Sequence, residues 1–379
     1  MALKNRKICI FGYNVSDALQ GKVVGGAELQ MALLAETLAE NGYEVLIIDR
    51  EAKSSFSYKE KIFIRALPDW DKGIRGIRLF THRIPRLLKC LKEANAEIYY
   101  VRGCTYLFLA PLYVARRLKA KFVMALSHDS ELWTFRERYR IFYIKNANLW
   151  DWVSTILPNE LAYAIIPKYS NVLMVQHKDQ IQLAQSRGLK SIMFPNIVNS
   201  DVYTIEGNKE RKNFVVVGAI SSRKSLHLLI PVIKKIGDKI FEFVGTPGDL
   251  IGEKISEELK SLKNVLMHGR LNRKDTLKKI AGAKALVNTS RMEGFPNAFL
   301  EAWALGTPVI SLFVDPGDVI KTHNLGYFCN GDVNLLQNIL NLNHYDINEE
   351  NLRSYVRDNH SPSAAIAAFE KILSDDLTS

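Results

Sequence analysis

Two successive series of short apolar runs, separated by amphipathic stretches, constrain the fold of this 379-residue chain most strongly. The runs are continuous and rich in Val and Ile, as in parallel strands buried on both faces. Their alternation with helical patterns is typical of βαβ units, so two series predict two doubly wound domains. The expected strands are residues 7–11, 44–49, 61–66, 97–101, 121–127 and 171–176, then 213–219, 240–245, 264–269, 285–290 and 308–312.

A polar stretch over residues 196–213 separates the two series. We therefore predict an N-terminal Rossmann-like domain over residues 1–200 and a C-terminal one over residues 201–358. Residues 359–379 are expected to form a helix that packs back toward the first domain. Helical patterns at about residues 26–40, 74–93 and 105–118 lie between the first strands.

The four cysteines, Cys9, Cys90, Cys104 and Cys329, are scattered without a CxxC pair. This spacing favours a reducing compartment over a disulfide framework or a zinc site. The first residues lack a signal-peptide core, and no stretch offers the roughly 20 apolar residues of a membrane span. We expect a cytoplasmic protein.

The excess positive charge lies in the first half of the chain. Residues 1–200 hold 29 Lys and Arg against 18 Asp and Glu, a net charge of +11, whereas residues 201–379 hold 22 of each. Residues 72–92 contain no acidic residue and place these cations among apolar side chains: Lys72, Arg75, Arg78, Arg83, Arg86, Lys89 and Lys92. Such a segment suits peripheral attachment to an anionic membrane surface, and the alternative is an ordinary helix with a solvated basic face. We predict attachment to the inner face of the cell membrane and no nucleic-acid partner.

Residues 284–311 carry the most informative motif. A buried strand ends near Ser290, a Gly-Phe-Pro turn opens a helix, and Gly306 ends that helix before the next strand. Glu293 lies in the turn and Glu301 lies one turn into the helix. Because ligands bind at the carboxyl ends of parallel strands against helix N-termini, the free backbone N–H groups of Asn297, Ala298 and Phe299 are expected to form a diphosphate site.

The stretch from Glu293 to Glu301 resembles the E-x7-E motif of retaining GT-B glycosyltransferases, and the whole segment resembles family 4 of that class. Other segments match that family in order and spacing: Val216-Val217-Gly218 followed by Arg223-Lys224, Gly25-Gly26 before an amphipathic helix, Leu126-Ser127-His128-Asp129 after a strand, and Phe194-Pro195-Asn196. The resemblance implies the α/β GT-B fold, in which two Rossmann-like domains face each other across a cleft.

The resemblance assigns a role to each matching residue. It implies that Glu293 contacts the donor sugar beside the backbone of Gly294 and Phe295, and that Glu301 accepts both ribose hydroxyls. It further implies that Lys224 neutralises the diphosphate, that the backbone at Arg270 lies against the base, and that His128 reaches the reacting sugar. Gly25, Gly26 and Gly218 would allow close approach to the ligand. Ala219 stands where many family members carry arginine, and Arg223 is the candidate to supply that charge.

Three of these assignments compete with structural interpretations from the sequence itself. His128 after a strand could be a capping or core residue, Lys224 could be a solvated lysine at a helix start, and Gly25-Gly26 could be a loop before a helix. Asp69-Trp70-Asp71 is a literal DxD motif, but it lies in the first half before the basic segment, so no metal is expected there.

Together these features predict a retaining glycosyltransferase that uses a nucleotide-diphosphate sugar, without cofactor or metal, and a lipid-linked or glycan acceptor of surface-polysaccharide synthesis. The sequence shows no candidate nucleophile, and front-face and double-displacement chemistry both stay open. The alternatives are a nucleotide-sugar epimerase and a non-catalytic nucleotide-sugar-binding protein on the same fold. A dinucleotide oxidoreductase is disfavoured, because neither half has a GxGxxG motif after its first strand.

Overall fold

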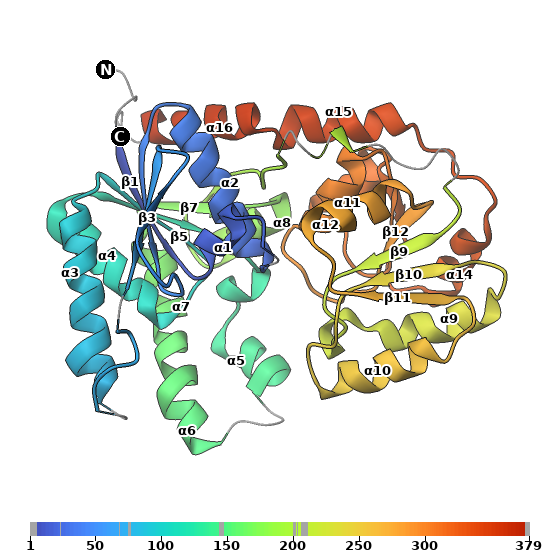
Figure 1. Ribbon diagram of the computed structural model, residues 1–379, viewed down its shortest axis with the longest axis horizontal. Coiled ribbons are helices and arrows are strands. Elements are labelled where there is room, and N and C mark those ends of the chain that lie inside the picture. The colour runs from blue at the N-terminus through green and yellow to red at the C-terminus, as the bar shows by residue number, and fades with distance from the viewer. Residues whose placement is uncertain are drawn as a thin grey trace. The chain divides into compact units, whose positions relative to one another are not determined.

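The computed structural model describes residues 6–22, 24–67, 69–74, 77–143, 148–199, 202, 204–205 and 211–375. The chain divides into two compact units, of which the first comprises residues 1–197 and 365–379 and the second residues 198–364. Each unit is built on one sheet of mainly parallel strands covered by helices (Figure 1). The predicted fold class, two doubly wound α/β domains, is confirmed.

The sheet of the first unit has the strand order β3-β4-β2-β1-β5-β6-β7-β8, in which only the pair of β3 and β4 is antiparallel. The strands are β1 (Lys7–Gly12), β2 (Glu44–Asp49), β3 (Phe56–Tyr58), β4 (Ile62–Ala66), β5 (Ile98–Arg102), β6 (Lys121–Ala125), β7 (Val172–Val175) and β8 (Ile192–Met193). The helices are α1 (Val15–Leu19), α2 (Gly26–Glu40), α3 (Ile84–Ala94), α4 (Leu109–Leu118), α5 (Phe135–Arg138), α6 (Leu149–Asp151), α7 (Leu157–Tyr169), α8 (Lys178–Ser186) and α16 (Pro362–Asp375).

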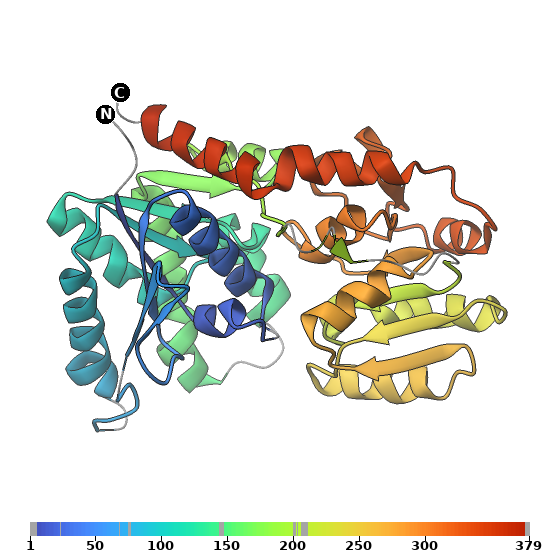
Figure 2. The ribbon, with the colours of Figure 1, turned by 45° about the horizontal axis from the view of Figure 1, so that its top comes forward.

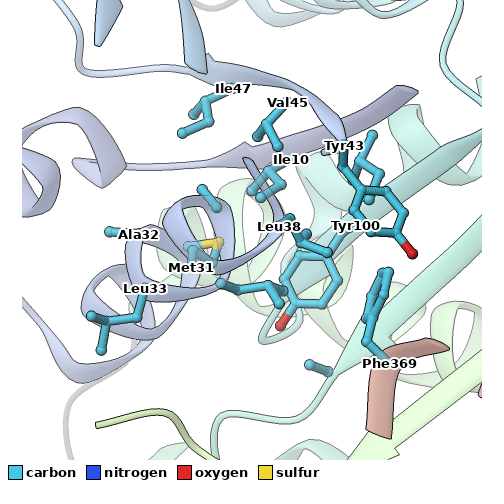
Figure 3. Close-up of a cluster of buried hydrophobic side chains, with 14 of the residues drawn as sticks. Ile10, Met31, Ala32, Leu33, Leu38, Tyr43, Val45, Ile47, Tyr100 and Phe369 are labelled. Carbon is cyan, nitrogen blue, oxygen red and sulfur yellow. The ribbon is translucent and has the colours of Figure 1, made fainter. Parts of the chain in front are cut away.

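Alternate residues of β1 belong to two hydrophobic cores, one on each face of this sheet. Ile8 and Ile10 pack with α2 and with the end of the chain, whereas Cys9 and Phe11 pack with α3, α4 and α7. Figure 3 shows the first of these cores, in which Phe369 of α16 lies near the ring of Tyr43 at a centroid distance of 6.1 Å. The C-terminal helix thus contributes to the hydrophobic core of the first unit.

The basic segment at residues 72–92 forms a π-helical turn over Leu79–Arg83 that continues into α3, with Pro85 in the first turn of α3. Two aspartates from the preceding DxD motif pair with its cations. Asp69 pairs with Lys72 and Arg86 at 2.8 and 3.5 Å, and Asp71 with Arg78 at 3.6 Å and with Arg83. Four cations of the segment are therefore paired with aspartates that precede it in the chain. Arg75 lies outside the described residues.

The second unit has the strand order β11-β10-β9-β12-β13-β14, with every pair parallel. Its strands are β9 (Phe214–Val217), β10 (Phe241–Val244), β11 (Val265–Gly269), β12 (Ala285–Asn288), β13 (Val309–Ser311) and β14 (Gly326–Phe328). Its helices are α9 (Leu229–Lys235), α10 (Leu250–Lys260), α11 (Arg273–Ala281), α12 (Asn297–Ala304), α13 (Val319–Thr322), α14 (Val333–Asn341) and α15 (Glu349–His360).

The two faces of this second sheet are covered by different helices (Figure 1 and Figure 2). Phe214 and Val216 of β9 pack with α9, α10 and α14, whereas Val215 packs with α11, α12 and α15. Among the described helices of both units, none combines the length and apolar composition needed to cross a bilayer.

We predict that Gly252→Ala destabilises the second unit, although alanine is the better helix former by about 1 kcal/mol. Gly252 lies in the first turn of α10, where an added Cβ would meet the Ile220 carbonyl oxygen at 1.9 Å. Relief of this clash must move α10 away from the loop after β9, at a cost of about 1–3 kcal/mol. Thermal or denaturant unfolding measures the change.

Gly237→Ala is the matched control, because its Cβ would meet nothing within 4 Å. A Gly252→Ala protein as stable as the Gly237→Ala protein would show that α10 does not depend on this close approach.

Candidate donor-binding site

The order of the strands reverses beside β9, since β9 pairs with β10 on one side and with β12 on the other. In open α/β sheets, ligands bind outside the carboxyl ends of the strands at such a switch point. A small pocket of about 10 Å³ lies there, lined by the end of β9 and the residues after it, and by side chains from its neighbours: Val216, Val217, Gly218, Ala219, Ile220, Lys224, Leu226, Phe243, Asn288 and Thr289.

The chain turns sharply where it leaves β9. Gly218 has a φ of +125°, which favours glycine, and its N–H donates to the Val244 carbonyl at 2.9 Å. Lys224 ends a 3-10 turn over Ser222–Lys224, and the Thr289 hydroxyl donates to the Lys224 carbonyl at 2.6 Å. This hydrogen bond joins the residue after β12 to the turn after β9.

Lys224 and Glu293 form an ion pair, with Nζ 2.7 Å from Oε1. Each side chain is about one-quarter exposed, at 27% and 25%. Burial alone would raise the pKa of Glu293, but the charge and hydrogen bond of Lys224 outweigh it, aided by Arg223, so the pKa lies below its usual range. Glu293 is therefore a carboxylate at neutral pH, and the site carries a fixed cation beside a fixed anion.

Arg223 is exposed in the same turn as Lys224, and its charge acts on Glu293. Ala219, where many family members carry arginine, lines the pocket. The position directly after Gly218 thus carries no charge, whereas the turn that holds Lys224 also holds Arg223.

The turn after β12 leads into α12 through Gly294, Phe295 and Pro296. Pro296 is the N-cap residue and makes no side-chain cap. The Phe295 and Phe299 side chains are 6% and 1% exposed and pack on Trp303, so only their backbones are available to a ligand. The expectation of a free N–H at Phe299 was wrong, because it donates to the Pro296 carbonyl at 3.0 Å in the first helical turn. Asn297 and Ala298 precede it at the start of α12.

Glu301 is paired with Arg273, whose Nη1 lies 2.8 Å from Glu301 Oε1. The Glu301 side chain is 12% exposed and that of Arg273 is 25% exposed. Arg273 is the first residue of α11, which follows β11 through Arg270, an exposed residue after the left-handed Gly269. Arg273 is not among the residues predicted from the sequence, although it follows a predicted strand whose carboxyl end lies at the same edge of the sheet.

The remaining predicted residues belong to the first unit. Gly25 is the exposed N-cap residue of α2, and Gly26 begins that helix. His128 follows β6 and caps the 3-10 turn Asp129–Leu132, because its Nδ1 accepts the Ser130 N–H at 3.1 Å. The structural interpretations of these residues are therefore correct, and a role in binding stays compatible with them. Since Nδ1 is an acceptor, the neutral His128 ring carries its proton on Nε2.

Glu131 supports the loop that carries His128. Its carboxylate accepts hydrogen bonds from the N–H and the hydroxyl of Ser127, and its side chain is buried. Burial raises the pKa of Glu131 to about 7, against the opposing hydrogen bonds from Ser127 and the charge of Arg102. Glu131 is not among the residues predicted from the sequence.

No group of three or more His, Cys, Asp or Glu side chains in the described part of the chain could hold a metal ion. The DxD aspartates instead form the ion pairs with Lys72, Arg78, Arg83 and Arg86. All four cysteines are free.

Two family models match successive parts of the chain. Glycosyltransferase Family 4 matches residues 24–201, and Glycosyl transferases group 1 matches residues 211–343. A human protein, one of the subunits of phosphatidylinositol N-acetylglucosaminyltransferase, is 22% identical over 331 residues, which are 83% of this chain and 64% of the relative. The chain thus spans less than two thirds of that relative's length.

Solved structures share the fold at low sequence identity. Sucrose-phosphate synthase from Thermosynechococcus elongatus superposes with a TM-score of 0.75 at 14% identity, covering 99% of this chain and 100% of that one. Anabaena HepE in complex with UDP and glucose gives 0.72 at 15% identity, over 98% and 100%. WaaG, a glycosyltransferase of lipopolysaccharide biosynthesis, gives 0.64 at 17% identity, over 93% and 95%. The two family matches and this fold together show that the chain belongs to the GT-B glycosyltransferases.

Proposed function

We propose that this enzyme is a retaining hexosyltransferase that transfers a sugar from a nucleotide-diphosphate sugar to a lipid-linked or glycan acceptor. The Lys224–Glu293 pair at the switch point of the second sheet carries the proposal. It combines a cation for phosphate with a carboxylate for sugar hydroxyls at the edge where α/β sheets bind ligands. The structural neighbour HepE, solved with UDP and glucose, supports a donor of this chemical class.

Departure of the nucleotide diphosphate is the step that Lys224 assists. As the bond from the sugar C1 to the distal phosphate oxygen breaks, negative charge grows on that phosphate, and a cation already in place stabilises it without reorganisation. Arg223, in the same turn, adds a second positive charge. The acceptor hydroxyl forms the new bond to C1, and its proton goes to the departing nucleotide diphosphate or to solvent.

Glu301 is assigned to the ribose of the nucleotide. A carboxylate has two oxygens and accepts several hydrogen bonds, which suits two adjacent hydroxyls. Arg273 holds Oε1 from the neighbouring helix, so the carboxylate is oriented before a nucleotide arrives. The exposed backbone at Arg270 follows β11 at the same edge and is assigned to the base.

His128 is assigned to the reacting sugar as a hydrogen-bond donor through Nε2, because its Nδ1 is occupied by the Ser130 N–H. Gly25 and Gly26, at the exposed start of α2, are assigned to close approach of backbone to ligand. An epimerase or a binding protein on this fold would also hold the nucleotide, so an assay for nucleotide diphosphate release that depends on an added acceptor distinguishes transfer from both.

A lipid-linked acceptor is favoured by an exposed apolar surface on the first unit. The apolar helical surface, as we call it, consists of side chains over residues 135–161 that are 39% or more exposed: Phe135, Tyr139, Ile141, Phe142, Leu149, Trp150, Val153, Leu157 and Leu161. Arg136 and Arg140 are exposed in the same segment. Aromatic and aliphatic side chains with adjacent cations suit the interface of an anionic bilayer. The name of the human relative, which includes phosphatidylinositol, agrees with an acceptor of this kind.

We predict that Glu301→Ala weakens binding of the cognate nucleotide by about 1.5–3 kcal/mol, since the ribose hydroxyls lose a charged acceptor. Glu293→Gln should chiefly lower kcat. Calorimetric titration and the coupled release assay measure the two effects after a thermal-shift screen of UDP-, GDP-, ADP- and dTDP-sugars. At 100 times its dissociation constant, the cognate donor should stabilise the protein by about 2.7 kcal/mol.

Glu258→Gln provides the matched control, because Glu258 pairs with Lys234 at the same 2.7 Å on the surface of this unit. Wild-type binding and turnover in both Glu301→Ala and Glu293→Gln would refute the assignment of the donor site.

We predict that Lys224→Ala lowers kcat more than it raises KM, because the charge on the leaving phosphate grows in the transition state. Lys234→Ala should leave both constants near wild type. Arg223→Ala should lower kcat only if Arg223 serves in place of the family arginine at position 219. Transfer should persist in excess EDTA, and a complete loss that Mn²⁺ restores would contradict a metal-free mechanism.

We predict salt-sensitive binding to anionic liposomes in co-sedimentation, with little binding to neutral ones. Leu149→Ser and Trp150→Ser should each weaken it about tenfold or more, because a fully buried apolar side chain contributes about 1.5–3 kcal/mol. Leu250→Ser is the control, since Leu250 is 77% exposed on the second unit. Absence of binding, or equal binding by all three variants, would favour an acceptor free in solution.

A further inference from the structure

Glu131 is a buried carboxyl group to which the proposed function gives no role. It lies in the 3-10 turn Asp129–Leu132, directly after His128, and is only 6% exposed. Its Oε2 accepts the backbone N–H of Ser127 at 3.1 Å, and its Oε1 accepts the Ser127 hydroxyl. Burial of a carboxylate costs free energy that hydrogen bonds and nearby charges must offset, so its place beside the candidate site calls for an explanation.

The contact between Ser127 and Glu131 is packed against the end of β5. Gly103, the residue after β5, has a φ of +89°, and its N–H donates to the Ala125 carbonyl at the end of β6 at 2.8 Å. A Cβ at Gly103 would lie 3.3 Å from Ser127 Oγ and 3.6 Å from Glu131 Oε1. The contact thus lies close to the backbone of the neighbouring strand end.

The chain after His128 is fixed by a second buried group. His128 Nδ1 accepts the Ser130 N–H at 3.1 Å, and the Ser130 carbonyl accepts Arg138 Nη1 at 3.0 Å. Arg138 donates to both carboxylate oxygens of Glu160 of α7 at 2.7 and 2.6 Å, and these two side chains are 5% and 11% exposed. The segment on the C-terminal side of His128 is therefore fixed from α7, and Glu131 fixes the residue on its N-terminal side.

We propose that Glu131 is a positioning residue, which through Ser127 fixes the His128 ring in the orientation that presents Nε2 to the reacting sugar. This inference rests on the proposed function, in which His128 contacts that sugar. An ionised carboxylate suits the task, because charge-assisted hydrogen bonds are shorter and stronger than neutral ones. The competing explanation is a carboxyl group that only stabilises the folded unit.

The hydrogen bonds of Glu131 should depend on pH near neutrality. Burial raises its pKa to about 7, against the hydrogen bonds from Ser127 and the charge of Arg102. Protonation removes the charge and turns one carboxyl oxygen into a donor, so the contact with Ser127 weakens as the pH falls. The other charged or titratable groups around Glu131 are His128 and Asp129 of its own segment, Cys104 after β5, Arg138 of α5, Glu160 of α7 and His177 before α8.

The first test is NMR of protein labelled with ¹⁵N in its histidine rings, which needs no ligand. The His128 signals are identified by their loss in His128→Asn. In wild type they should report a ring protonated on Nε2, since Nδ1 accepts the Ser130 N–H. Glu131→Gln keeps the shape of the side chain without its charge, and Ser127→Ala removes the hydroxyl donor. Both variants should shift the His128 signals toward the average of the two tautomers.

The second test measures release of nucleotide diphosphate to water. The substrate is the UDP-, GDP-, ADP- or dTDP-sugar that raises the melting temperature of wild type most. Glu131→Gln should lower kcat about tenfold or more and leave KM within about twofold, because a misplaced group loses its contact in the transition state. Wild-type kcat should rise as the pH increases through about 7, and this rise should be absent in Glu131→Gln.

Glu137→Gln is the matched control. Glu137 accepts the N–H and the hydroxyl of Thr134 at 2.5 and 2.7 Å, which is the same kind of contact, but it is exposed and pairs with Arg187. Its replacement should leave the His128 signals and the pH dependence of kcat as in wild type. Thermal unfolding of both variants measures any loss of stability separately.

Wild-type ring signals and an unchanged pH profile in Glu131→Gln would overturn the inference, whatever its stability, and identify a purely structural carboxyl group. A lower kcat with wild-type ring signals would overturn it as well, since Glu131 would then act on another group. If Glu131→Gln does not fold, wild-type ring signals in Ser127→Ala have the same consequence. Failure of wild type to bind every nucleotide sugar would overturn the proposed function, whereas the ring signals would still show whether Glu131 fixes His128.

Discussion

The reversal of strand order beside β9 is the constraint on which the donor-binding unit depends. The connections from β9 to β10 and from β11 to β12 cover opposite faces of the sheet, so the carboxyl ends of β9 and β12 are left beside each other. Gly218, Gly245 and Gly252 then allow the loops and α10 to approach closely, since a Cβ at Gly245 or Gly252 would meet a backbone carbonyl within 2.0 Å. These close approaches fix the course of the loop after β9, which leads into the turn Ser222–Lys224.

The ion pairs of the candidate site are more deeply buried than those of the surface. Lys224–Glu293 and Lys234–Glu258 have the same 2.7 Å separation, but the side chains of the second pair are about half exposed. Exposed pairs gain little because solvent screens them and their side chains lose freedom. The partly buried pairs hold carboxylates at fixed positions, which is the preorganisation that a charge-developing reaction requires. A contribution to folding stability alone would not explain why two such pairs, Lys224–Glu293 and Arg273–Glu301, lie at one edge of the sheet.

The sequence predicted the parts of the fold that depend on local pattern. Continuous apolar runs marked eleven of the strands within a few residues, and the strand–turn–helix around Glu293 formed where Gly294 and Pro296 indicated it. Contacts between segments that are far apart in the chain could not be predicted from the local sequence pattern. The Arg273–Glu301 pair joins two helices, and Asp69 and Asp71 neutralise arginines that a window over residues 72–92 counted as uncompensated. The short strands β3, β8 and β14 and the helices α5–α7 were not predicted either, because their apolar residues follow neither period over a sufficient length.

The departure at Ala219 has a physical consequence for the surroundings of Lys224. Ala219 contributes a methyl group to the wall where a guanidinium would stand in many family members, so the pocket keeps an apolar lining around Lys224. In such surroundings an ammonium group is a stronger partner for an anionic oxygen than it would be in water, because the local dielectric constant is low. Under the proposed function, the charge on the departing phosphate would be met by Lys224 and Arg223, which share one turn, and not by a side chain at position 219.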